Sequence, residues 1–175
     1  YKAIVFWILK IFSNIFLKKK KNNMYKLCQL LSGINKNLVP ESLIIRAVLA
    51  SYFETKESDI RKVYSVFESV GFKTCEIIEN TIEYFMEEER RNLESSKGKL
   101  QKIEIKNIQK LIEIIKQLLI ISKSEDQYEI GRTIVTSSLK VLHQHKKYLE
   151  LFLYYVYKTI KPEKSIVNGL VKGTV

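Results

Sequence analysis

The chain has 175 residues, of which 46% are hydrophobic and 28% charged, and its formal net charge at pH 7 is +11. The chain has only 6 Gly, 2 Pro and 2 Cys, and this composition excludes a collagen-like protein, a proline-rich disordered protein and a disulfide scaffold. It also lacks the frequent turn residues of a β-sandwich. We therefore expect an all-α protein. Because Cys28 and Cys75 lie far apart in the sequence, we expect both thiols to stay reduced, as in the cytosol.

The first 23 residues differ from the rest of the chain. Residues 1–17 are mostly apolar, four lysines follow at 18–21, and the whole segment holds six lysines and no acidic residue. A membrane-spanning helix needs about 20 apolar residues, and this run is shorter and contains Lys10. We therefore expect Met24 to begin the working domain and 1–23 to be a leader outside it. A membrane anchor formed by 1–17 is the alternative, and the lysine run also permits weak contact with anionic lipid.

Apolar residues at helical spacing predict an N-terminal helical module over 24–94. Its expected helices cover 24–36, 41–53, 59–70 and 73–91. Pro40 precedes the second helix, where its fixed backbone angle suits a helix start, and Gly71 ends the third helix. Thr55 or Ser58 is the expected cap of that third helix.

A serine- and glycine-containing linker at 95–99 is expected to separate this module from a second one, 100–175. A strong amphipathic helix is predicted over 100–122. A capping box at 124–127 then opens a long helical pattern that reaches Ile160 and is expected to break near Gly131. Pro162 ends that helix, and we expect the last helix, which begins at Glu163, to be incomplete.

The charge is unevenly distributed between these two expected modules. Residues 24–100 hold 11 basic and 12 acidic residues, and residues 101–175 hold 13 basic and 7 acidic residues. A near-neutral half followed by a basic half predicts two modules with different partners. The lysines of the second half are either a solvated surface or the rim of a groove for an acidic, leucine-rich helix. Their charge would also suit phosphates, so a nucleic-acid-binding or ribosome-associated protein is the alternative.

No pattern in the sequence points to catalysis, to a metal or to a cofactor. His143 and His145 are the only histidines, and two positions apart on an expected helix they cannot share one metal ion. The cysteines have no CxxC spacing, and the glycines form no phosphate-binding loop. Tyr154, Tyr155 and Tyr157 could stack on bases, but we expect them to pack in the core. We therefore expect a protein that works by binding.

Several segments resemble the programmed cell death protein 10 family, also called the cerebral cavernous malformation 3 family. They follow the family's order over most of 24–166: MYKLCQLLSGINKNL (24–38), LIIRAVLASYF (43–53), DI (59–60), VGF (70–72), IEYFMEEE (82–89), NLESSKGKLQKI (92–103), IQKLIEIIKQLL (108–119), LHQHKKYLELF (142–152) and TIKPEKSI (159–166). Two features depart from the family. The stretch 100–108 is too short for the family's first bundle helix, and the last helix is incomplete, so the resemblance implies a trimmed bundle.

The resemblance implies a non-catalytic, two-module adaptor of the cytoplasm, found peripherally at the Golgi or the plasma membrane. The first module would form a homodimer, or would instead pair with the C-terminal tail of a class III germinal centre kinase. The second would resemble a focal-adhesion-targeting bundle and dock leucine-rich acidic helices of striatin, paxillin-like or cerebral cavernous malformation 2 proteins, and so join a kinase/phosphatase assembly.

The resemblance also places the two binding surfaces. The positions that match the family's dimer surface are Ile45, Val48, Val63 and Val66. Lys116 and Lys161 match lysines of the family's helix-docking groove, and we add Lys110 because it lies earlier on the same expected helix.

Overall fold

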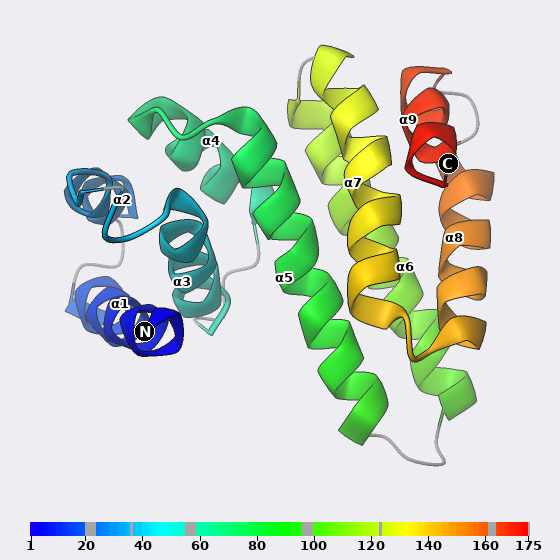
Figure 1. Ribbon diagram of the computed structural model, residues 1–175, viewed down its shortest axis with the longest axis horizontal. Helices are drawn as coiled ribbons and strands as arrows, with labels where there is room; N and C mark the ends of the chain where they lie inside the picture. Colours follow the sequence, from blue (N-terminus) through cyan, green and yellow to red (C-terminus); the bar gives the residue numbers. More distant parts are fainter. Residues whose placement is uncertain are drawn as a thin grey trace. The chain divides into compact units, whose positions relative to one another are not determined.

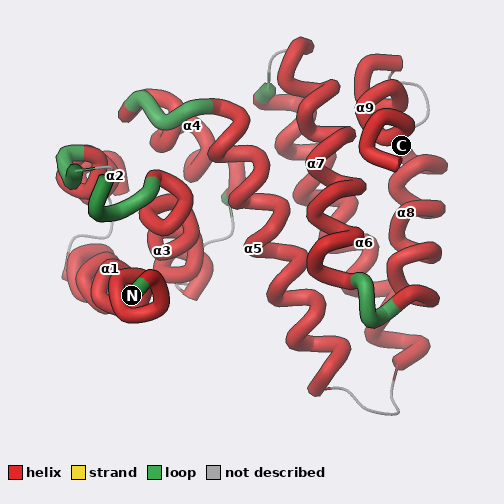
Figure 2. Tube along the Cα trace, in the orientation of Figure 1, coloured by secondary structure: helices red, strands yellow, loops and turns green. Residues whose placement is uncertain are grey.

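The computed structural model describes residues 1–19, 24–35, 37–54, 59–95, 100–122, 124–160 and 164–174, and for 100–107, 124 and 125 it describes the backbone alone. These residues form helices joined by turns and short loops, and no strand occurs among them (Figures 1 and 2). The helices are α1 (Lys2–Lys19), α2 (Met24–Ser32), α3 (Glu41–Glu54), α4 (Ile60–Val70), α5 (Thr74–Ser95), α6 (Leu100–Ile121), α7 (Ser124–Leu142), α8 (Lys146–Ile160) and α9 (Lys164–Thr174). The predicted all-α class is confirmed.

The chain divides into two compact units, unit 1 (Tyr1–Thr81) and unit 2 (Ile82–Val175). The division falls inside α5 rather than at the expected linker, most of which (96–99) lies outside the described residues. Unit 1 holds 13 basic and 7 acidic residues, and unit 2 holds 17 and 12. Both units are therefore basic, +6 and +5. We expected a near-neutral half followed by a basic half. The two units do not differ in this way, because the lysines of α1 add positive charge to unit 1.

In unit 1, α1 packs along α3 (Figure 1). The contact is made through small side chains, since Ser13 on α1 and Ser51 on α3 are both fully buried. The Ser51 hydroxyl donates a hydrogen bond to the Lys10 carbonyl oxygen at 3.2 Å, and the Lys10 ammonium forms an ion pair with Glu54 at 2.6 Å. Residues 2–19 of the segment expected to lie outside the folded domain thus form a helix packed on α3. No helix of the described residues is long and apolar enough to cross a membrane.

The ends of α4 follow the chemistry of helix caps. The Asp59 side chain accepts a hydrogen bond from the Arg61 backbone N–H at 3.0 Å, so Asp59 is the N-cap, whereas Thr55 and Ser58 lie outside the described residues. Gly71 has φ 99°, the left-handed conformation that favours glycine, and its N–H donates to the carbonyl groups of Glu68 and Phe67. The prediction that Gly71 ends this helix is confirmed.

In unit 2, the backbones of α7 and α9 come into direct contact at glycine residues. A side chain on Gly131 would collide with the Ile166 carbonyl oxygen and lie 3.0 Å from the Leu170 backbone nitrogen. A side chain on Gly169 would collide with the Tyr128 carbonyl oxygen. These two residues therefore permit the close packing of the two helices.

The long helix predicted to reach Ile160 is two helices, and its break does not lie at Gly131. The chain turns at residues 143–145, and α7 ends at Leu142 before it. Gly131 is inside α7, where its missing side chain makes room for α9. The two histidines consequently lie in the turn and not on a helix.

Candidate interaction surfaces

The predicted docking lysines lie on α6, apart from Lys161, which is outside the described residues. Lys110 and Lys116 are both exposed. Six residues along a helix correspond to a rotation of about 120° between side chains, so the two lysines project from different sides of α6. The described lysines of this prediction therefore do not form one row, and Lys116 has to be considered with its own neighbours.

Lys116 shares one side of α6 with an exposed aliphatic residue. Ile120 is one helical turn further on and is 73% exposed, the highest value for a large hydrophobic residue of unit 2 among those described. Gln109 and Glu113 are exposed on the same side, within an arc of about 60°. We call Gln109, Glu113, Lys116 and Ile120 the α6 face. The buried stripe of this helix, which includes Ile108, Ile115 and Leu118, lies on another side.

The residues expected to form a dimer surface are mostly inside the chain. Ile45, Val48 and Val63 are fully buried, and Val66 is half-buried. Ile45 lies about 120° around α3 from Ser51, whose hydroxyl is hydrogen-bonded to α1. In the single chain only Val66 of this set reaches the surface. A dimer that used the other three side chains would require unit 1 to open.

Another lysine of unit 2 is already paired within the chain. The Lys140 ammonium lies 3.3 Å from the carboxylate of Glu83, whose side chain is only 7% exposed. Next to this pair, the Ser138 hydroxyl lies 3.9 Å from the sulfur of Met86. These contacts join α5 to α7, so Lys140 has a structural partner and contributes less than Lys116 to the positive potential outside the chain.

The exposed side of α8 combines aromatic and basic residues. Tyr154 and Tyr157 are exposed, which corrects the expectation that they pack in the core. The Lys158 ammonium lies 5.9 Å from the centre of the Tyr154 ring, and Lys147 is exposed on the same side of the helix. Aromatic rings beside lysines are the elements of a surface that stacks bases and binds phosphates.

The histidines and cysteines are spread through the described residues without a group of three or more metal-binding side chains. His143 is exposed, and its Nδ1 lies 3.0 Å from the Lys140 carbonyl oxygen. His145 Nε2 lies 3.9 Å from the Glu94 carboxylate. Cys28 is buried, and this burial raises the pKa of its thiol to about 12, whereas Cys75 is exposed.

The two thiols should differ sharply in reactivity. Only the thiolate reacts with a disulfide reagent, and at about pH 8 the raised pKa leaves Cys28 almost wholly protonated as well as shielded. In the native chain we expect one thiol, Cys75, to react rapidly. In guanidinium chloride, where the chain is unfolded, both thiols should react. A chromogenic disulfide reagent counts the reacting thiols. Rapid reaction of both thiols in the native chain would contradict the burial of Cys28.

Comparison with known protein families, curated proteins and solved structures finds no match.

Proposed function

We propose that this chain is a non-catalytic helical adaptor and that the α6 face binds an acidic, leucine-rich amphipathic helix of a partner protein. The observation that carries this proposal is the exposed pair Lys116 and Ile120, one turn apart on α6. An aliphatic anchor beside a cation is what such a helix needs, since its leucines lose water against Ile120 and its carboxylates meet Lys116.

The partner classes follow the family resemblance. For unit 2 they are helical motifs of striatin, paxillin-like or cerebral cavernous malformation 2 proteins, and for unit 1 the C-terminal tail of a class III germinal centre kinase. Two weak sites on one chain would hold their partners at a high local concentration, which is how an adaptor acts without catalysing a reaction. Such a protein would work in the cytoplasm, peripherally at the Golgi or the plasma membrane.

The proposal is tested by the affinity of a synthetic acidic leucine-rich helix, measured by fluorescence anisotropy. Ile120→Asp should weaken binding by about thirtyfold or more, because it removes the anchor and adds a repelling charge. Lys116→Glu should weaken binding by about tenfold or more, because it replaces an attracting charge with a repelling one. Glu113→Gln should strengthen binding, because it removes a carboxylate that repels the acidic helix on the same face.

Lys172→Glu on α9 provides the matched control, since Lys172 is also exposed but belongs to another helix. We expect this variant to bind the peptide like the unmodified chain. Equal affinities for the Ile120, Lys116 and control variants would contradict the proposal.

A second candidate function, nucleic-acid binding, is favoured by Tyr154 and Lys158 on α8. The two functions differ in salt dependence, because phosphate binding releases counterions and so falls steeply as salt rises. Docking anchored by leucine and Ile120 should weaken only gently. Tight, salt-sensitive binding of single-stranded RNA that is lost in Tyr154→Ala would favour the second candidate.

A further inference from the structure

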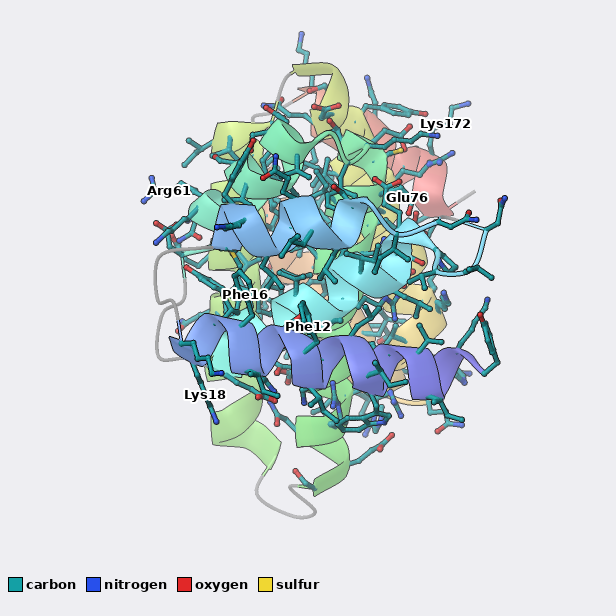
Figure 3. The ribbon with its side chains drawn as sticks, turned by 90° about the vertical axis from the view of Figure 1, so that its left-hand side faces the viewer. Phe12, Phe16, Lys18, Arg61, Glu76 and Lys172 are labelled. Carbon is teal, nitrogen blue, oxygen red and sulfur yellow. The ribbon has the colours of Figure 1, made fainter. Side chains whose placement is uncertain are left out.

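Helix α1 is apolar on two opposite sides, and only one of them is covered. Leu9, Ser13 and Leu17 are buried on the side that packs against α3. The opposite side bears a continuous exposed stripe that occupies an arc of about 140° around the helix. We call this stripe the outer α1 face; its residues are Ile4, Trp7, Ile8, Ile11, Phe12 and Ile15. Figure 3 shows α1 at the front of unit 1, with Phe12 and Lys18 labelled.

The charges of α1 are all positive, and two of them, Lys18 and Lys19, lie at one end of this face. Both are exposed and each lies about 50° from the middle of the stripe, whereas Lys2, exposed near the other end of the helix, lies about 150° from it. Lys10 is turned aside, because its ammonium is paired with Glu54 on α3 and lies 4.9 Å from the Trp7 ring centre. The outer α1 face is therefore uninterrupted by charge along its length, and no acidic residue occurs in α1.

This charge pattern disfavours a second copy of the chain as the occupant. Two α1 helices paired in parallel would place Lys18 and Lys19 against the same lysines of the other copy. Paired antiparallel, they would bring these lysines to the end that holds Lys2. In neither arrangement does α1 offer a carboxylate to compensate.

We infer that the outer α1 face binds the surface of an anionic lipid bilayer, with α1 lying in the plane of the interface. The aliphatic side chains enter the acyl boundary, Trp7 takes the interfacial position that tryptophan prefers, and Lys18 and Lys19 contact anionic headgroups. The side of α1 on α3 stays packed, so unit 1 binds the membrane peripherally and no segment needs to cross it. This inference does not rest on the peptide-docking proposal, since it uses a different helix and a different unit.

The chain carries its own reporter for this inference, because Trp7 is its only tryptophan and is 56% exposed. We expect the emission of Trp7 to shift to the blue when the full chain is mixed with phosphatidylcholine vesicles that contain about 30% phosphatidylserine. Brominated acyl chains should quench that emission. Vesicles of phosphatidylcholine alone should bind about thirtyfold more weakly, because the attraction of at least two lysines is lost.

Variants separate the outer α1 face from other basic surfaces. Ile8→Asp with Ile11→Asp should abolish the blue shift and weaken sedimentation with anionic vesicles by about tenfold or more. Val171→Asp, a change of an exposed aliphatic residue on α9, should do neither. Circular dichroism should show unchanged helix content, since both isoleucines are exposed.

Three results would overturn the inference. The first is the absence of a blue shift with anionic vesicles. The second is equal vesicle binding by the Ile8 and Ile11 variant, which would place adsorption elsewhere on the chain. The third is a dimer in analytical ultracentrifugation that the same variant dissociates, which would make the outer α1 face a protein interface.

Discussion

Gly169→Ala should detach α9 from α7 and lower the free energy of unfolding of unit 2 by about 3 kcal/mol, although alanine favours helices over glycine by about 1 kcal/mol. The added methyl group would collide with the Tyr128 carbonyl oxygen and lie 3.0 Å from the Arg132 backbone nitrogen. Backbone atoms inside a helix cannot move aside as a flexible side chain can, so the two helices must separate. Urea denaturation followed by circular dichroism measures the loss. Hydrogen exchange should show that protection disappears first in α9.

Gly33→Ala is the matched control for this substitution. Gly33 is exposed after α2, and an added side chain would only meet the Leu30 carbonyl oxygen at 3.4 Å, an ordinary contact. We expect a change within about 0.5 kcal/mol. If Gly169→Ala proved as harmless as Gly33→Ala, the close approach of α7 and α9 would be contradicted.

Leu9→Asp should destabilise unit 1 by about 3 to 5 kcal/mol, because it leaves a cavity and places a carboxylate between α1 and α3. Leu9 is 6% exposed and belongs to the side of α1 that packs on α3. Hydrogen exchange should show lost protection in α1 and α3, while unit 2 keeps its protection.

Ile8→Asp makes the same chemical change at the neighbouring position, where the side chain is 61% exposed. We expect it to alter the free energy of unfolding by no more than about 0.5 kcal/mol. The pair of variants therefore tests whether α1 is part of unit 1. Should Leu9→Asp and Ile8→Asp have equally small effects, α1 would not be packed on α3, and the original expectation of a leader outside the domain would stand.

Local chemistry made several features of the fold predictable. Pro40 lies directly before α3, Gly71 ends α4, and the apolar spacing located the helices from α2 to α6 to within a few residues. Gly131 was misinterpreted because a glycine within a helical pattern serves equally well as a break or as a close contact. Only its neighbour α9, which begins 33 residues further along the chain, distinguishes the two uses.

The surfaces were harder to predict, because periodicity identifies apolar residues but not what covers them. Ile45 and Val48 have the spacing of an interface and of a core alike, and in the single chain they are core. Ile120 was missed, although it lies outside the buried stripe of α6, and an aliphatic residue off the stripe is a usable signal. The two apolar sides of α1 are also visible in the sequence once 1–19 is treated as a helix.

The most direct test of the adaptor account is to map an acidic leucine-rich helical peptide onto the full chain by nuclear magnetic resonance with labelled isoleucine methyl groups. The account predicts that the Ile120 methyl resonance shifts on titration together with the Lys116 backbone amide, while the resonances of buried Ile108 and Ile115 move little. Shifts confined to other helices, or no shift at peptide concentrations of about 1 mM, where even weak docking would be detected, would contradict it.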